Sequence, residues 1–218
     1  MSRNKKYTLL IPFIIVFAIP IILWLQQIGS FTAYFDGSSP PGQLPYIFSK
    51  LVGMIALVCI AWQIIITLSN QLKIITVRWL GYSHRVFGAV ILLFAISHFF
   101  LFFIAVTLRQ DALALSLVLP DFRDFYHTHL TFGLFGLWLL CTVAVVGWLR
   151  SRKRTYWTEK LHSLYWVAIG CIYFHALAVG SESQSSAGFL FYAGLGLIMI
   201  GLGCWAMAKH WASKVAFP

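Results

Sequence analysis

The chain has 218 residues, of which 60% are hydrophobic and only 10% are charged. An ordinary soluble domain carries about 25% charged residues, so this composition excludes that class and indicates an integral membrane protein in a lipid bilayer. The net charge of +10 does not require a nucleic-acid partner, because the cations fit a membrane topology.

Six apolar segments are long enough to cross a bilayer as helices, since a span needs about 20 residues. The first segment is too long for the apolar part of a secretory signal and lacks a small-residue cleavage pattern. The sequence therefore predicts one all-α integral membrane domain over residues 1–218, folded as a six-transmembrane-helix bundle. In chain order the predicted helices are 7–27, 44–69, 80–108, 130–149, 156–179 and 189–208.

The distribution of charge predicts the orientation. With the N-terminus inside, the opposite loops carry mostly acidic residues, with only Arg109 and Arg123 as cations. This positive-inside pattern predicts a multi-pass protein of a bacterial inner membrane with both termini in the cytoplasm. The predicted inner cations are Arg3, Lys5, Lys6, Lys73, Arg78, Arg150, Arg152, Lys153, Arg154, Lys160, Lys209 and Lys214, and the outer acids are Asp36, Asp111, Asp121, Asp124 and Glu182.

Four histidines lie within two of these segments, where an ionisable side chain is costly and usually functional. His84 and His98 are fourteen positions apart in the third segment, and His162 and His175 are thirteen apart in the fifth. At about 1.5 Å per residue, each pair spans roughly 20 Å. The two segments run in the same direction, which predicts an inner pair, His84 with His162, and an outer pair, His98 with His175. Two neutral imidazoles suit the axial positions of a haem iron, so we expect two b-type haems between the third and fifth helices.

The second spacing is awkward for a regular helix. A step of fourteen positions returns His98 to within about 40° of the face of His84, whereas a step of thirteen leaves His175 about 140° from His162. The fifth helix is therefore predicted to be distorted, with Gly170 as the expected site, or its ligands reach the haems from different sides.

The run Leu80–Arg85 (Leu-Gly-Tyr-Ser-His-Arg), with His98, His162 and His175, resembles the ferric reductase-like transmembrane domain superfamily. This superfamily includes NADPH oxidases, ferric-chelate reductases and the haem-binding subunit of the periplasmic methionine sulfoxide reductase system. The resemblance covers roughly residues 44–208 and implies a six-helix bundle with two stacked b-type haems. Unlike the oxidases, the chain contains no segment expected to bind FAD or NADPH, so we expect a separate cytoplasmic flavin/NAD(P)H reductase.

Several polar residues are candidates for supporting roles. Arginine can contact a carboxylate with two nitrogens, so Arg85 at the inner level, and Arg109 and Arg123 at the outer level, are candidate partners of haem propionates. Lys50 is a further candidate at the outer level, although lysine cannot make the two-nitrogen contact.

His127 and His129, at the outer mouth of the fourth helix, are candidate contacts for an electron acceptor. They could share one metal only in an extended segment, because neighbours two apart diverge on a helix. Histidines that merely bond to interfacial water are the alternative.

These features predict an oxidoreductase subunit with no catalytic side chain of its own. Electrons would come from a flavin-dependent donor, with FMN or FAD in a partner or at the cytoplasmic face, and would reach a ferric chelate or a periplasmic oxidoreductase outside. Alternatives are a subunit of a methionine sulfoxide reductase system and a quinol-fed cytochrome b. A histidine-based metal or proton transporter is a different class, but it predicts acidic partners within the helices, and none of the six acidic residues lies deep in one.

Overall fold

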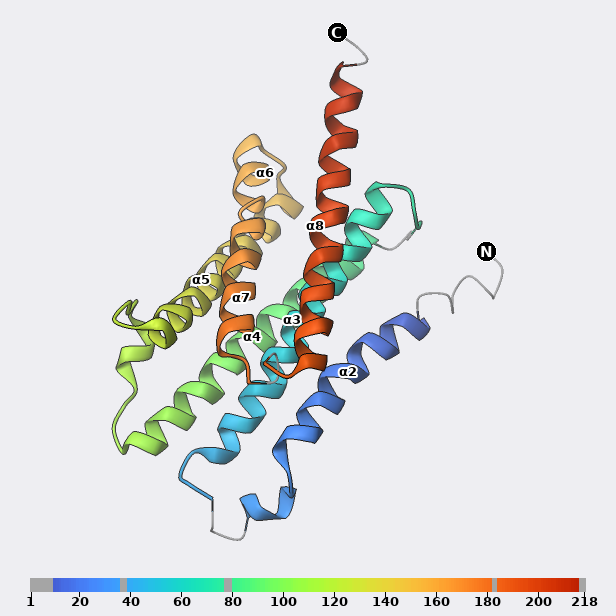
Figure 1. Cartoon of the computed structure of the whole chain (residues 1–218). Helices are drawn as coiled ribbons and strands as arrows, with labels where there is room; N and C mark the ends of the chain where they lie inside the picture. Colours follow the sequence, from blue (N-terminus) through green and yellow to red (C-terminus); the bar gives the residue numbers. More distant parts are fainter. Residues whose placement is uncertain (1–9, 36–38, 77–79, 182–183, 216–218) are drawn as a thin grey trace.

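The computed structural model describes residues 10–35, 39–76, 80–181 and 184–215, which contain helices and no strand. Residues 7–9 of the first predicted helix lie outside the described residues. Two short 3-10 helices, Phe31–Tyr34 and Leu115–Val118, lie in connecting loops (Figure 1). The α-helices are α2 (Leu10–Ile28), α3 (Gln43–Gln71), α4 (Leu80–Gln110), α5 (Phe125–Arg152), α6 (Tyr156–His162), α7 (Tyr165–Val179) and α8 (Ser186–Val215).

The described residues contain six candidate membrane spans, one of which is formed by α6 and α7 together, so the predicted six-helix architecture is confirmed. Most helices extend beyond their apolar stretch, which is why hydropathy alone placed their ends too far inward. At the start of α5, for example, the Asp124 carboxylate accepts a hydrogen bond from the backbone N–H of His127 at 2.8 Å. This cap starts the helix at Phe125 rather than at residue 130.

The fifth predicted helix is interrupted, but not where the sequence suggested. Gly170 lies inside the continuous helix α7, so its predicted role was wrong. The break follows His162, where the N–H of Leu164 bonds to the carbonyl of Leu161 at 3.1 Å, a tighter pattern than that of an α-helix. The interruption changes the rotation between His162 and His175, because 3-10 turns advance by a larger angle per residue than α-helical turns.

The bundle is built from two tightly packed helix pairs. α3 packs along α4, and α5 packs along α7, while α2 and α8 pack against α3. α3 is the most enclosed span, and its residues Val58 and Ala61 are fully buried in the apolar core. The two pairs contact each other chiefly through α4 and α5. A cavity between the pairs is lined by residues of both, including His98 of α4 and His175 of α7.

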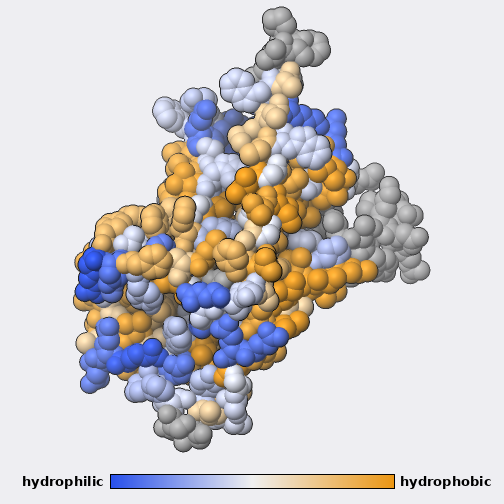
Figure 2. All heavy atoms as spheres, viewed as in Figure 1, coloured by the Kyte–Doolittle hydropathy of each residue, from blue (hydrophilic) through white to orange (hydrophobic). Residues whose placement is uncertain are grey.

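The surface carries large apolar side chains on every long helix except α3, including Ile14 on α2, Leu93 on α4 and Leu197 on α8. Orange hydrophobic residues cover much of the face in Figure 2, and blue residues gather near its upper end and lower left. Such an apolar surface is favourable in contact with lipid and unfavourable in contact with water, so the chain is a multi-pass membrane protein.

Cations gather at one end of the bundle, formed by the C-terminal ends of α3, α5 and α8 together with α6 (Figure 1). The opposite end holds the connections from α2 to α3, α4 to α5 and α7 to α8. Of the residues in the predicted charge pattern, Arg3, Lys5, Lys6, Arg78, Asp36 and Glu182 lie outside the described residues. The described cations at the first end are Lys73, Arg150, Arg152, Lys153, Arg154, Lys160 and Lys209.

Candidate functional site

The structure brings the four histidines together as two facing pairs across the gap between the helix pairs. The ring centroids of His84 on α4 and His162 at the end of α6 are 6.2 Å apart. Those of His98 on α4 and His175 on α7 are also 6.2 Å apart. The same separation therefore occurs at two depths of the bundle.

This separation leaves room for one metal atom between two rings. An imidazole nitrogen binds a metal at about 2.0 Å and lies about 1.1 Å from its own ring centroid, so two imidazoles on opposite sides of one metal have centroids roughly 6.2 Å apart. Aromatic rings that pack edge to face can be equally distant. Hydrogen bonding at Nδ1 distinguishes a pair of rings that binds a metal from a pair that only packs edge to face.

Three of the four rings have their Nδ1 atoms beside backbone carbonyl oxygens of a neighbouring helix. A carbonyl can only accept, so Nδ1 carries the proton and the Nε2 lone pair is free for a ligand. If two such rings only packed edge to face, both Nε2 lone pairs would be left unused. A metal ion between the rings would accept both lone pairs. The bonds run from His98 to the Ser49 carbonyl at 2.8 Å, from His175 to the His129 carbonyl at 3.0 Å and from His162 to the Val143 carbonyl at 3.3 Å.

Glycines admit the same three rings to the neighbouring backbone. A Cβ at these glycines would crowd the imidazole, and below 3.0 Å either the ring or the helix would have to shift. The glycines are thus required by close approach, not by an unusual backbone conformation. The closest distances from such a Cβ are 2.7 Å from Gly53 to His98, 2.7 Å from Gly133 to His175 and 3.2 Å from Gly147 to His162.

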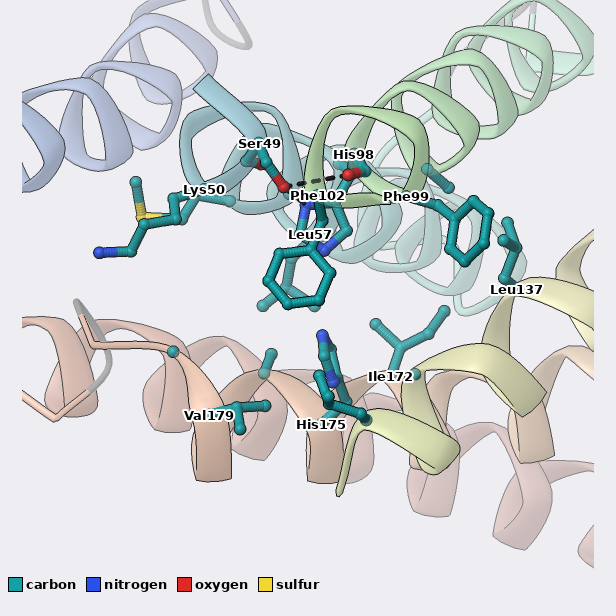
Figure 3. A pocket seen from close by; sticks show the side chains of 18 of the residues that line it. Ser49, Lys50, Leu57, His98, Phe99, Phe102, Leu137, Ile172, His175 and Val179 are labelled. Atoms are coloured by element: carbon teal, nitrogen blue, oxygen red, sulfur yellow. Dashed lines mark hydrogen bonds between the residues drawn. The ribbon is translucent and has the colours of Figure 1, made fainter. Parts of the chain in front are cut away.

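The outer pair opens onto a cavity between the helix pairs. Figure 3 shows His98 and His175 pointing toward each other from opposite sides of it. Most of its lining is apolar, and Tyr46 and Lys50 from the first turns of α3 also line it. An apolar slot with two opposed imidazoles fits a flat macrocycle that supplies the four equatorial ligands. The other apolar side chains labelled in Figure 3 are Leu57, Phe99, Phe102, Leu137, Ile172 and Val179.

The predicted outer cations differ in their placement. The Arg109 guanidinium and the Lys50 ammonium lie 5.4 Å and 5.2 Å from the centre of the Tyr46 ring, and both Lys50 and Tyr46 line the outer cavity. Arg123 instead belongs to a surface cluster, with its Nε 3.1 Å from the Asp121 carboxylate. Lys50 and Arg109 are thus better placed than Arg123 to meet a propionate.

At the inner level, Arg85 follows His84 in α4, and its side chain is exposed. The sequence did not single out Arg150, whose charge is close enough to act on both His84 and His162. Its guanidinium is also 4.0 Å from the Glu159 carboxylate. A signal was available, because Arg150 comes three residues after Gly147 and so lies on nearly the same face of the helix.

His127 and His129 are held separately on the first turns of α5. The Nδ1 of His127 lies 2.8 Å from the Asp124 carboxylate, and Arg123 contacts its other nitrogen. These bonds, led by the one from the His127 backbone N–H, hold the pKa of Asp124 below its ordinary value. His129 bonds to the Phe125 carbonyl at 2.7 Å. The extended arrangement needed for a shared metal does not form, and no group of three or more metal-ligating side chains occurs among the described residues.

No protein-family model, no curated protein and no solved structure matches this chain. The resemblance to the ferric reductase-like superfamily therefore stays a prediction from the histidine-bearing segments. The chemistry has to be argued from the geometry of the two imidazole pairs.

Proposed function

We propose that this chain is a membrane haem protein that carries electrons from a cytoplasmic flavin-dependent donor to an acceptor on the outer side. One observation carries the proposal: two imidazole pairs with the same 6.2 Å separation, stacked at two depths of an apolar bundle. One metal between two neutral imidazoles is the arrangement of a low-spin electron-transfer haem. A single such pair could arise from chance packing, but two pairs with the same separation support a pair of binding sites.

The residues present fit two b-type haems. His84 with His162, and His98 with His175, would hold the two irons, and each bound haem would supply a one-electron redox change. The carbonyl oxygens of Ser49, His129 and Val143 orient the imidazoles, and their hydrogen bonds make the Nε2 atoms stronger ligands. The apolar helices exclude water and competing reactants from the gap.

Cations stand where each haem edge would need them. Lys50 and Arg109 at the outer mouth, and Arg150 at the inner end, can neutralise propionates that point toward the two membrane surfaces. The inner pair lies nearest the cationic end of the bundle. The positive-inside rule favours a cytoplasmic location for that end, because Lys and Arg are enriched on the cytoplasmic side. The donor would then meet His84 and His162 first.

The sulfoxide-reductase and quinol-fed alternatives also use haem but differ in their electron donors and acceptors, and a yield of one haem per chain would favour the sulfoxide-reductase alternative. A metal transporter finds less support. It would need a cluster of three or more protein ligands for a bare ion, and the described residues hold none. A proton relay would need acidic groups deep within the spans, whereas Asp111, Asp121 and Asp124 lie at the outer helix ends or in loops. Glu159 lies near the start of its span and is paired with Arg154.

Sealed vesicles of known orientation test the proposal. Reduced flavin supplied on the cytoplasmic side should reduce an impermeant ferric chelate on the other side. The purified chain alone should not oxidise NADH or NADPH. His98→Ala should stop the transfer across the membrane, because the outer haem would be missing. Acceptor reduction confined to the donor side, or a purified chain without haem, would overturn the proposal.

A further inference from the structure

The three histidines with backbone partners share one local design. In each case the accepting carbonyl belongs to the residue four positions before the glycine that faces the ring. Within the helix that carbonyl already accepts the N–H of the glycine, which leaves it a second lone pair. Without a Cβ on the glycine, the ring can reach this lone pair. The carbonyl and glycine pairs are Ser49 with Gly53, His129 with Gly133, and Val143 with Gly147.

The fourth histidine, His84, departs from this design. α3 lies along α4, so the step of fourteen positions from His98 back to His84 corresponds to an equal step along α3 in the opposite direction. This step leads from Gly53 to Thr67. A threonine there places a branched side chain where the other three sites have none. His84 Nδ1 is buried and has no hydrogen-bond partner among the described residues.

The same step along α3 leads from Ser49 to Gln63, the residue whose carbonyl would be the expected partner of His84. That carbonyl is already engaged, because the Thr67 hydroxyl donates to it at 2.7 Å. The side chain of Gln63 lies against α4 one turn from His84, since its Nε2 is 3.9 Å from the position of a Cβ at Gly88. Its Oε1 is also buried without a hydrogen-bond partner in the described part of the chain.

We propose that Gln63 is a positioning residue for His84, with its side-chain Oε1 accepting a hydrogen bond from His84 Nδ1–H. Two complementary buried groups, one donor and one acceptor, then satisfy each other. The terminal amide torsion of a glutamine is soft, so Oε1 can turn toward α4 without a change in the backbone. His84 is thus held by a side chain, whereas the other three histidines are held by backbone carbonyls.

The consequence for redox behaviour rests on the proposed function. A hydrogen bond at Nδ1 raises the basicity of Nε2, and a more basic ligand favours the oxidised iron. Gln63→Leu keeps a similar volume but offers no acceptor. We expect the ratio of reduced to oxidised inner haem at a fixed potential to rise by about tenfold, if the lower end of the outer-shell effects on metal affinity sets the scale. The outer haem serves as an internal control and should not change.

A second substitution gives the sharper test. In the Gln63→Leu chain, Thr67→Gly removes both the branched side chain and the hydroxyl that occupies the carbonyl of residue 63. This change recreates the glycine and carbonyl arrangement of the other three histidines. The redox ratio of the inner haem should return toward that of the unmodified protein.

Redox titration and electron paramagnetic resonance of the purified two-haem protein provide the readouts, with the inner signal assigned in His98→Ala. A change in one haem that Thr67→Gly reverses supports the inference, and so does loss of the inner haem that Thr67→Gly restores. Unchanged potentials and spectra in Gln63→Leu, or changes that Thr67→Gly does not reverse, overturn it. A wild-type chain that binds no haem would instead refute the proposed function.

Discussion

The outer and inner histidine pairs have the same separation but are built differently. The outer histidines, His98 and His175, lie within continuous helices, and both Nδ1 atoms bond to carbonyls within 3.0 Å. Of the inner histidines, His162 is the last residue of the short helix α6 and makes a longer bond of 3.3 Å. His84 has no partner for its Nδ1 among the described residues.

This difference indicates that backbone carbonyls orient both histidines of the outer pair but only one histidine of the inner pair, His162. Carbonyls within a helix are fixed by the helix itself, so the outer ligands need little further support. The inner pair lies near the cationic end of the bundle, where Arg150 can act on both rings. We therefore expect the outer site to respond mainly to changes in packing and the inner site to changes in charge.

The largest expected effect is the loss of one haem. His98→Ala should reduce the pyridine haemochrome yield from two haems per chain to one, because the inner pair shares no ligand with the outer pair. His129→Ala is the matched control. Its carbonyl, not its side chain, holds His175, so both haems should remain. If His98→Ala removed all haem from a protein that still folds, the two sites could not be independent.

A series of glycine substitutions measures how much the close approach matters. Gly53→Ala should displace His98 and lower the occupancy of the outer haem, because its Cβ would come within 2.7 Å of the ring. Gly147→Ala should affect the inner haem less, since its contact would be 3.2 Å.

Gly170→Ala is the control for this series, because nothing lies within 4 Å of a Cβ there. It should retain both haems and stabilise α7 by about 0.5–1 kcal/mol through helix propensity. Haem absorbance and thermal unfolding in detergent give the ranking. Equal effects at Gly53 and Gly170 would show that the glycines do not cradle the rings.

The smallest effect is expected from charge at the inner site. Arg150→Gln should shift the inner haem toward its oxidised form at a fixed potential, because a nearby cation favours the more negative reduced state. The shift should be less than about tenfold, since the arginine is partly exposed and water screens its charge. Arg152→Gln is the control, as that guanidinium stacks 4.1 Å over Trp148. Redox titration should show a change for the first substitution only.

Several features of this fold follow from local sequence alone. Six spans follow from apolar runs of the right length, because a helix that faces lipid needs a continuous apolar surface. The placement of His84 and His98 on one face also follows from the sequence, since a step of fourteen positions makes nearly whole turns. These features depend only on composition and helical period.

Other features needed the packed structure. The sequence contains many helical glycines, but only packing decides that Gly53, Gly133 and Gly147 meet imidazole rings whereas Gly170 meets nothing. Likewise, the interruption after His162 lies where α6 joins α7. No helix-breaking residue type at that point predicts it. Contacts between helices depend on rotation, depth and crossing, which are set by all the neighbours together. The sequence by itself therefore determined the spans and the depths of the histidines, and the tertiary structure decided which groups hold each ring.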